Sequence, residues 1–382
     1  MKKIFKRFIV FLVVAVLSST ATLGAIYYAL GFNSHSFTNL MRFITAYRFI
    51  ETHYVNDTDD TKLIDAAMDG MVKSLDDPHS NYLSPEMYKR LMEQTEGSFG
   101  GIGIVMGKDN DDNIKIVAVM EDSPGQKAGL LEGDQIIAVD NTPVNAMQFE
   151  DVATHVRGEV GTDVVITIQR DNAQQDITIT RDNIKLKTVG HKMLDNNIGY
   201  IQIVSFSEDT AKEFNDAYAD LESQGMKGLI LDLRNNPGGL LTTCVDIAKK
   251  LVPQGEIVSI VDKDGHKDTF TSDLAQLNYP VAVLINKNSA SASEILSGAI
   301  QDTKAGTIIG ETSYGKGSVQ TVLPMLGDDA VKLTIAKYYT PSGRSIDKVG
   351  IVPDIEIKLP EDMSVDTQLN KALEIINEKI SQ

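Results

Sequence analysis

The sequence predicts a multidomain protein in which an α/β core is combined with a β-rich insert and a group of N-terminal helices. Residues 183–360 alternate strand and helix patterns three times, which is typical of a largely parallel sheet covered by helices. Residues 97–182 contain short β-branched strands separated by turns, and residues 36–96 place apolar side chains at helical spacing. Because 382 residues exceed what one hydrophobic core usually holds, several domains are expected.

Residues 1–35 combine a basic start with an uncharged run, which predicts export. Four cations, Lys2, Lys3, Lys6 and Arg7, precede the run over residues 8–30. Its first half has the length of a signal-peptide apolar region and is followed by small residues that could allow cleavage, whereas the whole run is also long enough to anchor the chain in a bilayer. With the cations held inside, the rest of the chain should be exported in either case.

The overall composition excludes several classes of protein. The formal net charge is −17, and without the four N-terminal cations the remaining 32 basic and 53 acidic residues give −21. A body this acidic should repel phosphate backbones, so nucleic acid is not an expected partner. Cys244 is the one cysteine, and no two of the six histidines are three to five residues apart. The sequence therefore favours neither a disulfide nor a metal site, no cofactor is expected, and Cys244 is assigned to core packing.

The N-terminal helical region contains three candidate helices. Apolar spacing predicts the first over residues 40–50 and the second over residues 61–75. Ser84 followed by Pro85 is a typical N-cap with proline at the first helical position, and it predicts a third helix from there. Helices this few should pack on a neighbouring domain or on a partner subunit.

The same patterns divide the insert and the core into elements. In the insert, strands are predicted over 113–120, 134–140, 163–170 and 175–181, with a turn and short helix over 123–130. In the core, continuous apolar runs predict strands buried on both faces, each followed by a helix: strands over 198–206, 228–234 and 281–286, and helices over 208–224, 240–251 and from 292. A last amphipathic helix is predicted over 366–380, within the C-terminal segment 361–382.

The first candidate for chemistry is the turn after the strand at 228–234. The sequence LDLRNNPGGL places Pro237, Gly238 and Gly239 at the start of a helix, where exposed backbone N–H groups can hold a carbonyl oxygen as it becomes negative. A plain strand-to-helix turn uses the same residue types, so this motif alone leaves both interpretations open.

The second candidate is a group of three serines after the strand at 281–286. Ser289, Ser291 and Ser293 lie where the strand gives way to a helix. A serine at this junction can present its hydroxyl to a cleft, or it can be an ordinary N-cap. The spacing allows one serine to cap the helix while another reacts.

A reactive serine needs a base, and the sequence offers Lys316 in the segment GETSYGKGSVQ. If a strand begins at Lys316, alternation places Lys316, Ser318 and Gln320 on one face. A lysine base must be neutral near pH 7, which burial achieves by lowering its pKa by roughly 3 units. The alternative is an exposed lysine at a hairpin tip. The segment is also close to a phosphate loop, but Gly317 stands where serine or threonine must bind magnesium, and nucleotide binding is rejected.

Taken together, the segments DLRNNPGGL, SASASEI, SYGKGSVQ, YYTPSGRSI and GIVPDI resemble those of the carboxy-terminal processing peptidases, or tail-specific proteases, and occur in the same order. The resemblance extends over essentially the whole chain after residue 36. These are Ser–Lys proteases with an embedded PDZ domain and a crotonase-like α/β core. The resemblance implies a PDZ domain over residues 97–182 and a protease core over residues 183–360.

The resemblance also implies a role for individual residues. Ser291 is the expected nucleophile, Lys316 the general base and Gln320 the residue that orients the lysine. The expected oxyanion donors are the backbone amides of Gly238, with Gly239 as the alternative, and of Ala292. Some members of the family use an aspartate at the end of the nucleophile helix, which corresponds to Asp302; this residue could equally be structural.

In the PDZ domain, the resemblance places the carboxylate-binding loop at Gly101, Ile102, Gly103 and Ile104. Successive N–H groups there would bind a terminal carboxylate while the peptide adds as a strand to the sheet edge. Related proteases couple peptide binding to catalysis through an arginine of the PDZ domain, and the matching position is Arg157. The alternative is a surface arginine in a turn.

The expected function is therefore that of an exported serine endopeptidase of the bacterial cell envelope, membrane-anchored, periplasmic or extracellular. Its expected partners are protein or peptide substrates with free apolar C-termini, with a homodimer through the terminal helices and an adaptor or activating protease as further possibilities. The competing hypothesis is a catalytically idle PDZ scaffold that binds C-terminal tails without cleaving them.

Overall fold

The computed structural model describes residues 34–360 and 364–382, together with Phe11, Val14, Ser18, Thr22 and Gly24. The predicted signal peptide or anchor at residues 1–35 thus lies almost entirely outside the described residues. The chain divides into two compact units, Met1–Asp76 and Asp77–Gln382. Within the described part of the chain, no helix has both the length and the apolar composition needed to cross a bilayer.

The first unit contains two of the predicted helices, α2 (Ser34–His53) and α3 (Asp60–Lys73). Asp59 caps α3, because its side chain accepts a hydrogen bond from the Lys62 backbone amide. Helix α2 leaves large apolar side chains such as Phe37 and Phe49 exposed. The sequence prediction of helices here is confirmed.

The second unit begins with strand β1 (Asn81–Leu83) and helix α4 (Pro85–Glu96). Ser84 accepts a hydrogen bond from the Met87 amide and Pro85 opens the helix, as predicted. Residues 77–96 of the predicted helical region therefore belong to the unit that also contains the core. Strand β1, which the helical pattern does not predict, pairs with a strand of the core.

The β-rich insert is an antiparallel sheet with the strand order β3-β4-β5-β7-β8, in which β6 also pairs with β5. Its elements are β2 (Ser98–Gly101), β3 (Ile104–Lys108), β4 (Ile114–Val119), α5 (Pro124–Lys127), β5 (Gln135–Val139), β6 (Thr142–Pro143), η1 (Val144–Ala146), α6 (Phe149–Val156), β7 (Asp163–Arg170), β8 (Ala173–Thr180) and β9 (Asp182–Lys185). The four predicted strands are all present, and the predicted short helix is a single turn. Strands β2 and β9 form a separate two-stranded ribbon at the ends of the insert.

The core sheet has the order β10-β11-β12-β15-β16-β19. In this sheet β11, β12, β15, β16 and β19 are parallel to one another, and only the edge strand β10 is antiparallel to its neighbour. The elements are β10 (Val189–Leu194), η2 (Asp195–Asn197), β11 (Ile198–Ile203), α7 (Thr210–Ser223), β12 (Gly228–Asp232), α8 (Leu241–Leu251), β15 (Val281–Ile285), α9 (Ala292–Asp302), β16 (Gly306–Gly310), β19 (Ile355–Glu356) and α10 (Thr367–Ile380). The predicted strand–helix alternation and the last helix are confirmed.

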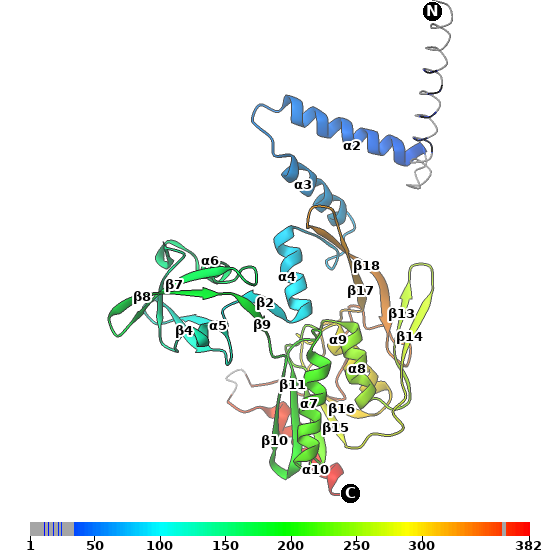
Figure 1. Cartoon of the computed structure of the whole chain (residues 1–382). Coiled ribbons are helices and arrows are strands. Elements are labelled where there is room, and N and C mark those ends of the chain that lie inside the picture. The colour runs from blue at the N-terminus through cyan, green and yellow to red at the C-terminus, as the bar shows by residue number, and fades with distance from the viewer. Residues whose placement is uncertain are drawn as a thin grey trace, which may run out of the picture. The chain divides into compact units, whose positions relative to one another are not determined.

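Both faces of this sheet are covered, which explains why its strands are continuously apolar. Every residue of β12 and of β15 is buried. Helices α7, α8 and α9 share one hydrophobic cluster with the sheet, and α10 forms a second cluster on the other face with Ile230, Ala282 and Leu284 (Figure 1). Cys244 is fully buried in the first cluster, as predicted.

A second, antiparallel sheet, with the order β1-β18-β13-β14, is mostly absent from the sequence prediction. Its strands are β13 (Gly255–Asp262), β14 (Lys267–Ser272), β17 (Ser318–Pro324), which pairs with β18, and β18 (Ala330–Tyr339). Only β17 has a predicted counterpart, and it begins at Ser318 rather than at Lys316. A bulge between Val319 and Gln320 interrupts its pairing with β18. Simple alternation from Lys316 through Gln320 is therefore wrong.

Candidate active site

Ser291 lies beyond the carboxyl end of strand β15, the edge at which parallel sheets bind ligands. It is the N-cap residue of α9 and has φ 54° and ψ −114°. Such a conformation costs a residue other than glycine about 1–3 kcal/mol, and it persists where the surrounding structure enforces it, often at functional sites.

The two other candidate serines serve the fold. The Ser289 hydroxyl is buried and donates to the Leu233 carbonyl at 2.8 Å. The Ser293 hydroxyl is also buried and donates to the Asn236 carbonyl at 3.0 Å. Ser291 alone of the three is partly exposed, so it is the serine that can meet a substrate.

The glycine turn lies against Ser291. Gly238 has φ 100°, and a Cβ atom at this position would come within 2.8 Å of the Ser291 Cβ and 2.9 Å of the Ala292 amide nitrogen. Asn236 fixes the turn, since its side-chain NH₂ group donates to the Ile203 carbonyl and its backbone carbonyl accepts a hydrogen bond from the Ala290 amide. Only glycine fits so close an approach in this backbone conformation.

The two predicted oxyanion donors differ in whether their backbone amide already donates a hydrogen bond within the structure. The Gly238 amide donates to the Asn236 side-chain oxygen at 2.8 Å. For the Ala292 amide, no acceptor is found within the described part of the chain. The Ala292 amide is therefore available to donate to an oxyanion, whereas the Gly238 amide would first have to break its hydrogen bond to Asn236. The amide of Gly239, the alternative donor, also has no acceptor among the described residues.

Glu294 joins the serine and lysine segments, and the sequence prediction did not include it. Its carboxylate is fully buried on α9 and accepts hydrogen bonds from the backbone amides of Ser291 and Lys316, both at 2.8 Å. It also accepts from the Gly315 amide at 2.7 Å and the Ser313 hydroxyl at 2.6 Å. The S-x-x-E spacing of a capping box from Ser291 to Glu294 was the available signal.

Lys316 is half-buried, and hydrogen bonds hold both its backbone amide and its backbone carbonyl. Its carbonyl accepts a hydrogen bond from the Tyr338 hydroxyl, which also donates to the Ser291 carbonyl at 3.3 Å. Burial, followed by repulsion from Lys332, lowers the pKa of the Lys316 amine, while Glu294 and Asp77 oppose this shift. Burial therefore favours the neutral form that a base requires.

Gln320 does not contact Lys316 in the way expected. Its side-chain amide donates to the Ser318 hydroxyl at 2.8 Å and to the Thr334 hydroxyl at 3.2 Å. The orienting role that was expected for Gln320 therefore stays a prediction.

Asp302 lies at the opposite end of α9 from Ser291. Eleven residues at about 1.5 Å each separate the two backbones by about 16 Å. Burial would raise the pKa of Asp302, but hydrogen bonds from Ser342 and the nearby Arg344 lower it below its ordinary value. Asp302 thus anchors the loop that contains Ser342 and Arg344, which is a structural role.

The strand end before the glycine turn is anchored to the last helix. Arg234 donates to the buried carboxylate of Asp232 and to Asp366, the N-cap of α10. Tyr200 donates its hydroxyl to the same Asp232. The C-terminal helix is therefore connected through Arg234 to the segment that leads into Asn236 and Gly238.

The predicted carboxylate-binding loop leads into β3, an edge strand of the insert sheet. The carbonyls of Ile102 and Gly103 accept hydrogen bonds from the Gly125 and Met120 amides. In a trans peptide the N–H points opposite to the C=O, so the amides of Gly103 and Ile104 point away from these donors. Among the described residues β3 is paired on one side only, with β4, so its other edge and the outward amides have the form of a site for a C-terminal peptide.

Arg157, the C-cap residue of α6, contacts residues outside the insert sheet. Its guanidinium lies 4.2 Å from the centroid of the Phe99 ring and 3.9 Å from the Glu93 carboxylate on α4. Arg181 holds the preceding turn of α6, because it donates to the carbonyls of His155 and Val156. Arg157 is therefore an exposed arginine that contacts Phe99 of β2 and Glu93 of α4.

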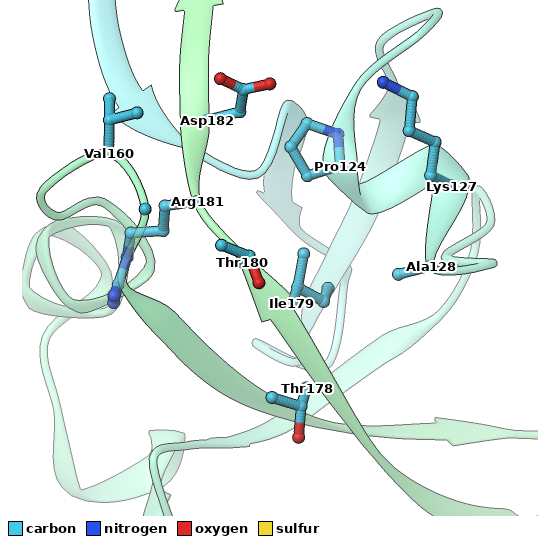
Figure 2. A pocket seen from close by; sticks show the side chains of 10 residues that line it. Pro124, Lys127, Ala128, Val160, Thr178, Ile179, Thr180, Arg181 and Asp182 are labelled. Atoms are coloured by element: carbon cyan, nitrogen blue, oxygen red, sulfur yellow. The ribbon is translucent and has the colours of Figure 1, made fainter.

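A pocket of about 540 Å³ lies beside Arg181. Figure 2 shows its lining, with Pro124 and Lys127 of α5 on one side and Thr178 and Thr180 of β8 on the other. None of the residues predicted for catalysis or peptide binding lines this pocket, but Asp182, which does, is the strand partner of Gly101 in the predicted carboxylate-binding loop.

One group of side chains has a composition suited to a metal ion. Asp262, Asp264 and His266 lie together at the tip of the β13–β14 hairpin. Asp262 already accepts hydrogen bonds from the backbone amides of the other two. These contacts account for the arrangement as a hairpin turn.

Comparison with known proteins agrees with this architecture. The chain matches the model of peptidase family S41 over residues 197–357, the PDZ domain over residues 115–170, and the N-terminal domain of the activating protease CtpB over residues 26–87. The carboxy-terminal-processing protease of Bartonella bacilliformis is 41% identical over 335 residues, which cover 85% of this chain and 76% of that protein. The carboxy-terminal processing protease CtpA of Bacillus subtilis is 39% identical over 368 residues, which cover 94% of this chain and 79% of that protein.

A solved structure of similar fold is a photosystem II D1 C-terminal processing protease, with a TM-score of 0.50 and 30% identity over 88% of this chain and 96% of that chain. An α/β core with an inserted PDZ domain defines a class of serine-type peptidase. The chain belongs to the carboxy-terminal processing proteases of peptidase family S41.

Proposed function

We propose that the chain is an exported endopeptidase that cleaves proteins near their C-termini, with Ser291 as nucleophile and Lys316 as general base. The observation that carries this proposal is the Glu294 carboxylate, which accepts hydrogen bonds from the backbone amides of both residues. Two segments that are 25 positions apart in the sequence are thereby held at one buried anchor.

The proposed reaction proceeds through an acyl-enzyme. The Ser291 hydroxyl attacks the scissile carbonyl and gives its proton to the neutral Lys316 amine, which passes that proton to the departing amine of the substrate. The Ala292 amide, with Gly238 once it is released from Asn236, stabilises the oxyanion. Water then attacks the acyl-enzyme, with Lys316 again accepting the proton, and Ser291 is regenerated. Gln320 is assigned to orient Lys316 by the family resemblance, although in this structure its side-chain amide donates to the hydroxyls of Ser318 and Thr334.

Substrate capture is assigned to the PDZ domain. A free C-terminal carboxylate binds the amides at Gly101, Ile102, Gly103 and Ile104, and the peptide extends along the edge of β3. The scissile bond then lies upstream of the bound terminus. Substrates with apolar C-terminal residues are expected, because an apolar pocket reads the last side chain of the peptide.

Cleavage of a peptide that ends in Ala-Ala or Val-Ala tests the mechanism. Ser291→Ala and Lys316→Ala should each lower kcat/KM by more than about a thousandfold, because each removes a group that takes part in bond making or proton transfer. The exposed Ser223→Ala and Lys249→Ala variants are the matched controls and should cleave normally.

Mass spectrometry of the peptide separates the proposal from a binding scaffold. A scaffold binds the tail and leaves its mass unchanged, whereas the protease shortens it. Cleavage that persists in Ser291→Ala or in Lys316→Ala would contradict the assigned mechanism.

Export and further partners are part of the same proposal. The basic start and apolar run of residues 1–35 support export, by a cleaved signal peptide or by an anchor.

The exposed apolar side chains of α2, among them Phe37 and Phe49, support a homodimer through the terminal helices, which light scattering on residues 36–382 would test. The match to the N-terminal domain of an activating protease is consistent with a role in proteolytic activation.

A further inference from the structure

The loop over residues 204–209, between β11 and α7, pairs with the glycine turn. The Phe206 amide donates to the Gly238 carbonyl at 3.0 Å, and the Leu240 amide donates to the Phe206 carbonyl at 2.7 Å. Phe206 and Gly239 thereby form a parallel bridge, which is so close that a Cβ atom on Gly239 would come within 2.1 Å of the Phe206 carbonyl oxygen. The position of the 204–209 loop therefore sets the position of the turn that carries the proposed oxyanion donor.

Both chain segments that connect the insert to the core also contact this loop. On the side where the chain enters the insert, the Thr95 carbonyl near the end of α4 accepts a hydrogen bond from the Glu208 amide at 3.1 Å. On the side where the chain leaves the insert, the Thr188 carbonyl accepts a hydrogen bond from the Val204 amide at 3.0 Å. The 204–209 loop is thus hydrogen-bonded to the two connections of the insert and to the glycine turn.

A chain of hydroxyl groups holds the loop, and Thr210 stands at its centre. The Thr210 hydroxyl oxygen accepts a hydrogen bond from the Ser207 amide at 2.9 Å and lies 3.0 Å from the Ser207 hydroxyl. It also lies 2.7 Å from the Thr188 hydroxyl, which donates to the Glu213 carboxylate at 2.8 Å. Since Thr188 gives its own proton to Glu213, the proton of Thr210 is directed to Thr188 or to the Ser205 carbonyl at 3.2 Å, and the Ser207 hydroxyl donates to Thr210.

This chain of hydroxyl groups is shielded from solvent. Thr210, Ser207 and Thr188 are all buried, so water does not replace a partner that is lost. The Ser207 carbonyl is held as well, because it accepts a hydrogen bond from the buried Thr243 hydroxyl of α8 at 3.1 Å. Removal of the Thr210 hydroxyl would leave the amide and the hydroxyl of Ser207 without their acceptor, and a buried donor without an acceptor is costly. The loop would then have to move to satisfy these groups.

We propose that Thr210 is a positioning residue for oxyanion stabilisation, because its hydroxyl fixes the loop that holds the glycine turn against Ser291 and Ala292. N–H donors stabilise a transition state only if they are held where its negative charge develops. A displaced turn should therefore slow the reaction and leave substrate binding unchanged. The inference rests on the proposed Ser–Lys mechanism. Because both connections of the insert contact the same loop, the hydroxyl chain also joins the insert to the glycine turn.

Steady-state cleavage of the tail peptide tests the role of the hydroxyl. Thr210→Val should lower kcat by about tenfold, less than the roughly hundredfold or larger cost of losing a whole oxyanion donor, and should leave KM within about twofold of the wild-type value. Thr210→Ser keeps the hydroxyl and should retain a kcat near that of the wild type. A loss that the conservative variant rescues is a loss of the hydrogen bonds and not of side-chain volume.

A peptide aldehyde reports on the oxyanion site directly. The Ser291 oxygen adds to the aldehyde carbon and passes its proton to Lys316, and the former carbonyl oxygen then occupies the place of the oxyanion. Thr210→Val should weaken binding of the aldehyde by about tenfold, in parallel with kcat, because the adduct resembles the transition state. Binding of the corresponding peptide alcohol, which cannot form the adduct, should stay unchanged. A purely structural role of Thr210 would lower the melting temperature without separating the two ligands.

Controls distinguish this effect from damage to the fold and from failure of the mechanism. Thr269→Val, at an exposed threonine of β14, should change neither kcat nor the two affinities. Wild-type kcat in Thr210→Val, a loss of kcat without weaker aldehyde binding, or a Thr210→Ser variant as impaired as Thr210→Val would overturn the role of Thr210. If Thr210→Val does not fold, Thr188→Val breaks the same chain at the next hydroxyl and should give the same pattern with a smaller loss; wild-type kcat there would overturn the role as well. Retained cleavage in Ser291→Ala would instead overturn the mechanism on which the inference rests.

Discussion

At the residue scale, the Glu294 carboxylate brings the serine and lysine segments together. It is fully buried and accepts hydrogen bonds from four donors, two at each oxygen, so its negative charge is stabilised by the surrounding N–H and O–H groups. A glutamine at this position has only one acceptor oxygen, and its NH₂ group would face two donors.

Glu294→Gln should therefore lower kcat of peptide cleavage by about 100-fold, because small displacements of reacting groups cost rates of this order. The displacement acts on the backbones of Ser291 and Lys316, so steady-state kinetics should show a large change in kcat and a small one in KM. The exposed Glu378→Gln on α10 is the matched control. Wild-type kcat in Glu294→Gln would show that the shared carboxylate does not position the reacting groups.

At the residue scale, some members of the candidate site could be assigned from the sequence and others could not. Ser291 and Lys316 stand in short motifs at element ends, where a motif and its structural context can be read directly. The role of Gln320 was assigned from the family resemblance and stays a prediction, whereas the alternation that also placed it on one face with Lys316 does not hold, because β17 begins at Ser318 and contains a bulge. Glu294 could not be assigned, since it has the appearance of a capping residue.

At the scale of elements, Arg157 connects α6 to α4 and β2. Its contacts with Phe99 and Glu93 lie next to the two-stranded ribbon of β2 and β9, which joins the insert to the core. Arg181 fixes the end of α6 from the other side. A peptide that adds to β3 could alter the position of α6, and Arg157 is the side chain that would transmit this change.

Arg157→Ala should lower turnover of a tail peptide by about tenfold, a typical size for coupling between sites, while leaving its affinity for the chain unchanged. Affinity is measured by calorimetry in the Ser291→Ala background, so that no cleavage occurs. Arg90→Ala, at an exposed position on α4, serves as the control. Turnover equal to that of the wild type would leave Arg157 a packing residue, and a parallel loss of affinity would place it in peptide binding instead.

At the scale of the whole molecule, charge determines where the chain is expected to work. The acidic body carries −21, whereas the first seven residues carry four cations and no acid. Removal of residues 1–30 should leave the protein in the cytoplasm, while the complete chain should be recovered from the cell envelope or the medium. Fractionation followed by immunoblotting checks this. Cytoplasmic recovery of the complete chain would contradict export.

Much of the whole-molecule architecture could be predicted because its signals are local. Strands such as β12 and β15 are buried on both faces and appear as unbroken apolar runs, and helices such as α10 have a regular apolar face. The second sheet was missed for the opposite reason. Strand β14 is mostly exposed and polar, and β1 has three residues, so neither carries a pattern that is independent of its partner strand. The predicted domain boundaries within the second unit stay a prediction.

The sequence by itself determined the order of the elements, the glycine turn, the serine–helix junction and the lysine, because backbone preferences and apolar periodicity act over a few residues. Only the tertiary structure decided which serine is partly exposed, which amide is already engaged, and that Glu294 holds Ser291 and Lys316 together. Burial and electrostatic neighbourhood depend on residues far apart in the chain, and these set the chemistry of a lysine base.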